Sequence, residues 1–466
     1  MEVFKTILKL LVIAVVYFGV GPGLGKWMVG KDRVRRVILG FMAWWLVRPR
    51  ADFTLTLYSI ESYRGQTKGF EFNFIEAIAL GLSLAAIFER RKDFRWVMPG
   101  LLPWLVWVVL SCLSIPGAIE PLYAWMPAFK FLKLAVVMAG VFHAVHDIRD
   151  IRALMRGFAI ALIVQLFVCL FARYVHGAYR VIGWFEHQNP MAIWCYILAL
   201  PLLGLAMAKE SSSKDSALFL VAFGCAGLVV LLTVSRAALG AFVIGTALVM
   251  VASFIHGMTV RRAAMASLMM IGGGLAMAMA MHTFIARMKS AGDDSPENDL
   301  RFVLNQQSAA MQADHPVAGV GWNNFGLANS RPLGTKYSEM LETWEANRGH
   351  SINPEAFQAN PLTESLYWLT LAETGMAGYL GLLLVTLVFL YYGIRNTIAY
   401  WRTPIGLFLF GITAALAIGG IHGRVERVLG TETKNVTTLM ILRGVLSRVE
   451  WWRRKKVPLD TVMKQG

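Results

Sequence analysis

Long apolar segments recur along almost the whole of this 466-residue chain, separated by short polar stretches. A helix that crosses a membrane needs about 20 apolar residues, because each residue advances about 1.5 Å through a hydrocarbon layer of about 30 Å. The candidate segments cover residues 6–22, 35–48, 72–88, 98–114, 121–143, 153–174, 188–208, 217–233, 237–256, 263–285, 364–394, 404–421 and 436–449. The second and the last are short, so we predict an all-α polytopic membrane protein with about 12 or 13 transmembrane helices.

The composition excludes a large soluble protein. Hydrophobic residues make up 56% of the chain and charged residues only 16%, whereas soluble domains average about 25% charged residues. The first apolar segment lacks the small-residue cleavage site of a secretory signal, so we expect it to remain as a helix. The four cysteines have spacings that suggest neither a disulfide framework nor a metal cluster.

The net charge of +16 is a topology signal rather than a footprint for nucleic acid. Lysine and arginine gather in short loops and in the tail, at residues 25–36, 89–95, 149–152, 261–262 and 452–456. Short loops rich in these residues stay in the cytoplasm, where they also attract anionic lipid headgroups. Counting spans from these loops places residues 286–363 on the outer side of the membrane, away from the cytoplasm.

Four regions follow from this topology. Residues 1–285 are predicted to form an N-terminal transmembrane bundle, and residues 286–363 a periplasmic loop. Residues 364–449 are predicted to form the C-terminal transmembrane helices, and residues 450–466 a basic cytoplasmic tail. A polar loop of this length is unusual as a simple connection, so we expect chemistry on its side of the membrane.

Three arginines lie at predicted outer span ends or in the loop: Arg180, Arg236 and Arg301. An isolated arginine at a span end can extend to the headgroups, and for one arginine this is the more ordinary interpretation. A guanidinium also forms paired hydrogen bonds with phosphate. Three such arginines on one face favour a clamp for a diphosphate group.

His350 is the best-placed candidate base in the loop, because its unperturbed pKa near 6.5 allows it to accept a proton from a hydroxyl group. The alternative is a histidine that only packs the loop. The sequence contains neither an HExxH pattern nor an Asp/Glu cluster typical of a bound metal, so we expect no metal and no cofactor.

Two further groups could contribute to substrate binding. Lys130 and Lys133 lie inside a predicted span, where a charge must either face a cavity or partner, such as a lipid-linked anion, or extend to the headgroups. The segment GVGWNNFG (319–326) lacks the lysine of a phosphate-binding P-loop. It is expected to form a tight turn that brings Asn323 against the site.

The order of several segments resembles the O-antigen ligase and polymerase superfamily of bacterial membrane glycosyltransferases. The segments are RVIGWFEHQNPMA (180–192), LTVSRAALG (232–240), LRFVLNQQSAAMQADHPVAGVGWNNFG (300–326), a late loop histidine and SLYWLTLAETGMAGYLGLLL (365–384). The resemblance implies a GT-C-like helical fold in the bacterial inner membrane. It also implies transfer of a glycan from undecaprenyl diphosphate on the periplasmic face, for surface or exo-polysaccharide synthesis.

By this resemblance, Arg236 and Arg301 match diphosphate-contacting arginines of the family, and His350 matches its loop histidine. In many members that histidine directly precedes the helix ending in AETG. Here Thr363 and Glu364 hold that place, and His350 lies 13 residues before Thr363. Either the loop carries an insertion, or His350 is not the base and Glu364 lies nearer the acceptor.

Several functions remain open at this point. A polymerase would extend the lipid-linked glycan, a ligase would transfer it to lipid A core, and a related enzyme would transfer it to protein. The displaced histidine favours a polymerase over a ligase. A transporter or flippase for lipid-linked glycans is the alternative from another class, but it predicts repeated halves and broken helices, and the sequence shows no internal repeat.

Overall fold

The computed structural model describes residues 2–48, 54–59, 63, 65–208, 212–289, 296–330, 335–348, 362–428 and 432–463. The predicted base His350 lies outside these residues. The described chain is almost entirely helical, so the predicted all-α polytopic class is confirmed. Among the described residues, seven helices are long and apolar enough to cross a membrane, and three shorter helices are apolar as well.

A helix overlaps each of the predicted apolar segments. The N-terminal part contains α1 (Glu2–Ala14), a π-helical segment (Val15–Val20), α2 (Gly21–Met28), α3 (Asp32–Trp45), α4 (Phe74–Phe88), α5 (Leu101–Cys112), α6 (Pro121–Ala144) and α7 (Ile148–Tyr174). The remaining helices are α8 (Gln188–Ala206), α9 (Ser213–Thr233), α10 (Arg236–Ile255), α11 (Val260–Lys289), α12 (Pro296–Asp314), α13 (Phe325–Ala328), α14 (Lys336–Arg348), α16 (Leu366–Ala399), α17 (Gly406–His422), α18 (Thr433–Arg454) and α19 (Leu459–Val462).

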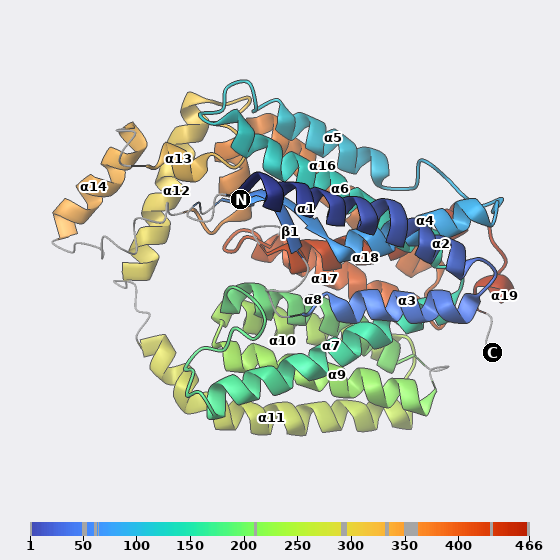
Figure 1. The fold of residues 1–466 in the computed structure, drawn as a ribbon. Coiled ribbons are helices and arrows are strands. Elements are labelled where there is room, and N and C mark those ends of the chain that lie inside the picture. The colour runs from blue at the N-terminus through green and yellow to red at the C-terminus, as the bar shows by residue number, and fades with distance from the viewer. Residues whose placement is uncertain are drawn as a thin grey trace.

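Most of these helices run side by side in one bundle, and α12, α13 and α14 gather at one end of it (Figure 1). The C-terminus lies near the opposite end. We call the end that carries α12 to α14 the outer end, following the predicted topology. The other end is called the inner end.

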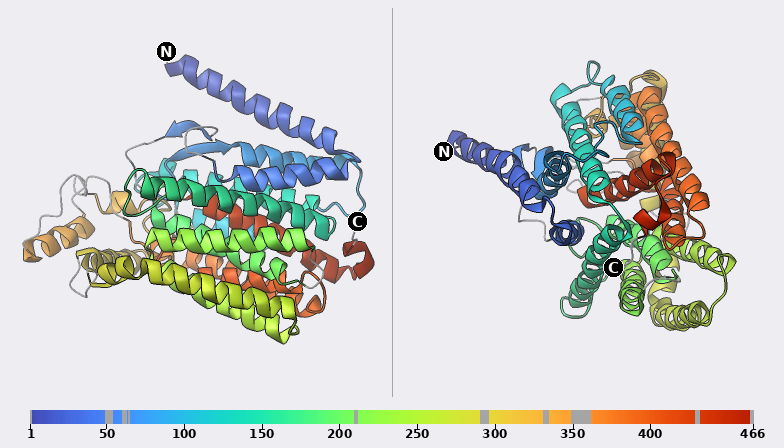
Figure 2. Two further views of the ribbon diagram at one scale, coloured as in Figure 1. Left: turned by 90° about the horizontal axis from the view of Figure 1, so that it is seen from below. Right: turned by 90° about the vertical axis from the view of Figure 1, so that its right-hand side faces the viewer.

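The centre of the bundle is formed by helices that are buried on every side. All residues of α8 except Pro190 are buried, and α18 is buried over almost its whole length. A helix without a polar face is stable only where a protein interior or a membrane surrounds it. The first span, Phe4–Met28, is the opposite case, because only 11% of it is buried and Figure 2 shows it leaning away at the edge of the bundle.

A short antiparallel sheet covers part of the outer end, where the sequence indicated only a loop. Strand β1 (Thr54–Ser59) pairs with β2 (Gly69–Asn73), with Thr56 opposite Glu71. The Lys9 ammonium donates a hydrogen bond of 2.9 Å to the carbonyl of Thr56 and thereby ties the first span to the sheet. At the end of β2, the Asn73 side chain accepts from the Ile75 N–H and caps α4.

Helix α16 is broken at Gly375, whose φ of 60° and ψ of −163° are not helical. A break at this depth frees backbone groups that cannot remain unbonded in a membrane. The turn after α12 binds them: the N–H of Val320 donates to the carbonyl of Ala372 (2.9 Å), and the N–H of Met376 donates to that of Pro316 (2.9 Å). A Cβ at Gly375 would collide with the backbone of Val317, so the close approach requires glycine.

Candidate active site at the outer end

The turn at residues 319–326 fastens the outer loops to the broken helix. Asn323 adopts a φ of 60°, and its side chain is fully buried. Its Oδ1 accepts hydrogen bonds from the N–H groups of Gln66 (2.5 Å) and Thr67 (3.3 Å), and its Nδ2 donates to the carbonyls of Thr67 (3.1 Å) and Tyr123 (3.2 Å). The predicted tight turn is confirmed, and these contacts of Asn323 are all with the protein itself.

The two lysines predicted inside a span also face the protein rather than lipid. Lys130 is buried and donates to the carbonyl of Gln66 at 3.3 Å. Lys133 forms an ion pair of 2.9 Å with Glu76 and lies over the rings of Phe72 and Phe129. The charge of Lys133 is therefore balanced within the fold, and any role of either lysine in substrate binding stays a prediction.

Arg301 lies on α12, directly in front of the N-terminus of α16. Its Nη2 forms an ion pair with Glu364 and lies 3.6 Å from Oε1 of Glu426. One turn further along α12, Asn305 accepts a hydrogen bond of 2.7 Å from the Thr363 hydroxyl. The two contacts hold α12 against α16 and leave the half-exposed Arg301 between two carboxylates.

Glu426 follows α17 and brings a third segment to Arg301. It accepts a hydrogen bond from Nδ2 of Asn189 at the start of α8. Burial raises the pKa of Glu426 above its usual range, and the nearby Glu364 carboxylate raises it further. Arg301 and Arg427 oppose this shift. A carboxyl group in this position can hold or release a proton near neutral pH.

His187 caps the N-terminus of α8, where its Nδ1 accepts from the N–H of Asn189 at 3.3 Å. Burial lowers the pKa of His187 below its ordinary value. The nearby Glu364 acts in the opposite direction, while the positive charges of Arg427, Arg180 and Arg301 favour the neutral ring. The neutral imidazole of His187 therefore lies within electrostatic range of Glu364 and of the three arginines.

The segment that carries His187 is held in place by the start of α18. The Lys434 ammonium donates to the carbonyl of Trp184, and Nδ2 of Asn435 donates to that of Pro190 at 3.0 Å. The N–H of Glu186 donates to Glu432 at 3.3 Å. These bonds fix the loop between α7 and α8 on both sides of the histidine.

The outer charge cluster is thus assembled from four separate stretches of the chain. It contains Arg180, His187, Asn189, Arg301, Glu364, Glu426 and Arg427. Arg301 contacts both carboxylates, and Arg180 and Arg427 lie within electrostatic range, so the cluster carries an excess of positive charge when both carboxylates are ionised. It can bind an anion through guanidinium groups and move a proton on a carboxyl group or an imidazole.

Arg236 lies apart from these contacts. It is the first residue of α10 and is exposed. Within the part of the chain that the structure describes, its side chain makes no hydrogen bond or ion pair. Its predicted role in diphosphate binding would therefore depend on a ligand that reaches from the cluster to α10.

Glu426, Arg427 and Asn189 were not predicted from the sequence as site residues. The signal that could have drawn attention to the first two is the charged stretch RVERVLGTETK in residues 424–434, between the predicted segments 404–421 and 436–449.

Residues 220–383 match the family model described as O-antigen ligase. The matched range runs from α9 through the broken part of α16, and it includes Arg236, Arg301 and Glu364. It ends before Glu426 and begins after His187. The match confirms the resemblance to the O-antigen ligase and polymerase superfamily. No curated protein sequence matches the chain.

Proposed function

We propose that the protein is a membrane glycosyltransferase of the ligase and polymerase type, because residues 220–383 match the family model described as O-antigen ligase. The donor is a glycan linked to undecaprenyl diphosphate, and the reaction takes place at the outer charge cluster on the periplasmic face of a bacterial inner membrane. The acceptor is a hydroxyl group.

The position of Arg301 is the observation that supports this proposal most directly. It is half-exposed at the outer end, so an arriving diphosphate can compete with Glu364 and Glu426 for its guanidinium. As the bond between the sugar and the diphosphate breaks, negative charge develops on the leaving group. Preorganised guanidinium groups stabilise that charge without a metal. Arg180 contributes to the same positive field.

A base must also remove the proton of the acceptor hydroxyl group. His350 remains our candidate from the sequence, although it lies outside the described residues. Glu364 is the alternative, because it lies in the cluster at the place where the family's histidine is expected. Glu426 interacts electrostatically with Glu364, so the protonation of one carboxyl group affects that of the other. We therefore expect one of His350, Glu364 and Glu426 to be indispensable for glycan transfer, and the other two to adjust the pKa of that residue.

The acceptor separates three related enzymes. We propose a polymerase, which adds the glycan to another lipid-linked glycan, because the place of the histidine departs from the family pattern. Transfer to lipid A core or to protein serine and threonine would use the same donor site.

The test is a transfer reaction with the purified full-length protein in detergent, with an undecaprenyl-diphosphate oligosaccharide and EDTA. Release of undecaprenyl diphosphate together with lengthening of the glycan supports a polymerase. Supplying lipid A core or an acceptor protein in separate reactions tests the other two acceptors. Strict dependence on a divalent metal would overturn the mechanism, and movement of the intact lipid-linked glycan across vesicles without bond cleavage would indicate a flippase.

The base is identified with matched variants in the same reaction. We expect His350→Ala to abolish transfer while the protein still inserts and purifies normally. If Glu364→Gln abolishes transfer and His350→Ala leaves it intact, then Glu364 is the base. Full activity in both variants would remove both assignments.

A further inference from the structure

Arg443 carries a positive charge into the middle of the bundle. It is 3% exposed and lies ten residues after the first residue of α18, which is about 15 Å along a helix from the outer end. A charged side chain at membrane depth is costly, so it faces the interior of a bundle and finds a partner there.

The guanidinium group of Arg443 contacts aromatic rings and a thioether rather than a carboxylate. The Arg443 Cζ lies 5.4 Å from the ring centroid of Trp104 and 5.1 Å from that of Phe389. Its Nη1 lies 3.8 Å from the Met440 sulfur, and its Nε has no hydrogen-bond partner among the described residues. Ring faces attract the positive charge but accept few of its five N–H donors.

Arg448, one and a half turns further along the same helix, shows the usual solution. It is equally buried, and its Nη2 forms an ion pair of 2.5 Å with Asp93. Within the described residues Arg443 has no such ion pair. The two arginines are therefore buried to the same extent, but only Arg448 has a carboxylate partner among the described residues.

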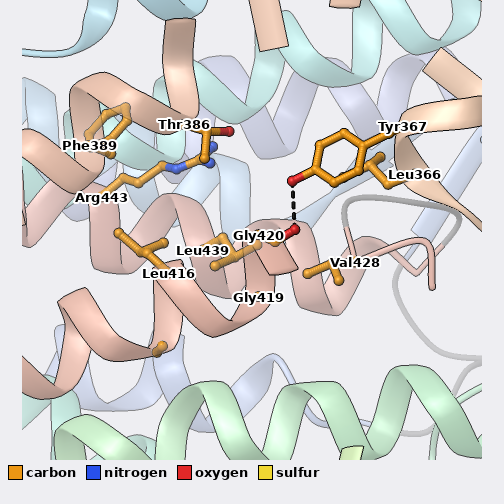
Figure 3. Close-up of a pocket in the computed structure, with 11 residues that line it drawn as sticks. Leu366, Tyr367, Thr386, Phe389, Leu416, Gly419, Gly420, Val428, Leu439 and Arg443 are labelled. Carbon is orange, nitrogen blue, oxygen red and sulfur yellow. Dashed lines mark hydrogen bonds between the residues drawn. The ribbon is translucent and has the colours of Figure 1, made fainter. Parts of the chain in front are cut away.

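A cavity lies at the guanidinium of Arg443, between α16, α17 and α18 (Figure 3). It extends toward the outer end, where Leu366, Tyr367 and Val428 line it. The Thr386 hydroxyl lies on its wall and donates to the carbonyl of Leu382 at 2.9 Å. The cavity is lined by no acidic side chain among the described residues, so the guanidinium dominates its electrostatic potential.

We propose that this cavity is a binding site for a small inorganic anion of the size of chloride. Its volume of about 30 Å³ exceeds the roughly 10–15 Å³ that one water molecule needs, so the cavity has room for a halide ion. The anion supplies the charge that Asp93 supplies to Arg448. It reaches the cavity from the outer end, past Tyr367.

The proposal is tested by thermal unfolding of the purified full-length protein in detergent, at constant ionic strength, with chloride replaced stepwise by gluconate. A ligand that binds only the folded state stabilises it by an amount that rises with the logarithm of its concentration above the Kd, so we expect Tm to rise by a few degrees with chloride. Arg443→Gln should abolish this dependence. Arg448→Lys, which keeps a cation beside Asp93, should retain it.

A second measurement does not depend on a variant that folds. Crystals of the wild-type protein grown in bromide should show an anomalous peak beside the Arg443 guanidinium. A protein whose Tm is the same in chloride and gluconate, and whose crystals show no peak there, contains only water in the cavity, and the proposal is then wrong. A chloride dependence that persists in Arg443→Gln would place the anion elsewhere and would also overturn it.

Discussion

The two ends of the bundle both carry clusters of charged side chains, but their burial differs. At the inner end, Asp150 is completely buried and accepts hydrogen bonds from Nη2 of Arg35 (3.2 Å), Nε of Arg36 (3.1 Å) and the N–H of His146 (2.8 Å). At the outer end, the side chains of Arg301 and Glu364 are 40% and 34% exposed. The carboxylate at the centre of the inner cluster is closed to solvent, whereas the ion pair of the outer cluster is open to a ligand.

The clusters also differ in how strictly their partners are fixed. Asp150 belongs to the capping box at the N-terminus of α7, so the same carboxylate caps a helix and binds two arginines. Arg301 serves two carboxylates from different segments and reaches one of them only at 3.6 Å. A cluster that stabilises the fold binds its members to each other, whereas a cluster that binds substrate must be able to exchange them.

The largest expected effect on stability is therefore at the inner end. Asp150→Ala leaves the buried Arg35 and the partly buried Arg36 with one partner fewer and removes the acceptor of the His146 N–H. Breaking a buried ion pair in this way costs about 3–5 kcal/mol. We expect a strong loss of apparent unfolding free energy in detergent, measured by thermal denaturation, with poor recovery of folded protein.

Asp32→Asn is the matched control, because Asp32 forms an ion pair of 2.5 Å with the same Arg35 but is 60% exposed. An exposed pair of this kind contributes about 0–1 kcal/mol. If the control were as destabilising as Asp150→Ala, then burial would not be what distinguishes the two ends of the bundle.

Hydropathy was sufficient to predict the transmembrane part of the fold, because each span must satisfy the same apolar layer whatever its neighbours are. It could not predict the outer sheet, since β1 and β2 are short and are held by Lys9 and Asn323 from distant segments. Asn323 was expected against the site, but its buried amide is used to fasten the loop at Gln66. A polar residue in a turn carries no sign of which partner it will meet.

Some residues of the outer charge cluster were predicted from the sequence, but the contacts between them were not. Arg301 and Glu364 were both selected from the sequence, but nothing in their separation of 63 residues showed that they would pair. Glu426 was missed because only the packing of α17 against α16 brings the segment after α17 to Arg301. The sequence predicts on which side of the membrane a residue lies. Which loops contact each other on that side is determined by how the helices pack.

Arg301→Ala tests the outer cluster and should change activity far more than stability. Loss of one preorganised group that stabilises developing charge reduces a rate by about 10²–10³-fold. The fold should survive, because the hydrogen bond between Thr363 and Asn305 still holds α12 on α16. The measurement is the initial rate of undecaprenyl diphosphate release, together with Tm.

Lys336→Ala is the control for this variant. Lys336 is an outer, exposed cation with its own carboxylate partner, Asp314, at 2.5 Å, and it lies outside the cluster. Arg301→Lys should recover only part of the rate, because an ammonium group cannot form the paired contacts of a guanidinium with a phosphate. Equal losses in Lys336→Ala and Arg301→Ala would mean that general outer charge, rather than the cluster, binds the donor.

The smallest expected effect is a change in how stability depends on pH. Burial and the nearby Glu364 hold the pKa of Glu426 in the folded protein above its ordinary value near 4.3. Between these two pKa values the folded state binds more protons than the unfolded state, so the unfolding free energy decreases as pH rises. This stabilising contribution of the Glu426 proton is complete below the ordinary pKa and is lost as pH rises through the pKa of the folded state.

Glu426→Gln keeps an oxygen that can accept from Asn189 but has no proton to lose, so its Tm should fall less with rising pH than that of the wild type. Glu339→Gln, at an exposed position on α14, should keep the wild-type profile. A wild-type slope in Glu426→Gln would show that the proton of the outer cluster resides on another group, and Glu364→Gln in the same titration would then identify or exclude its neighbour.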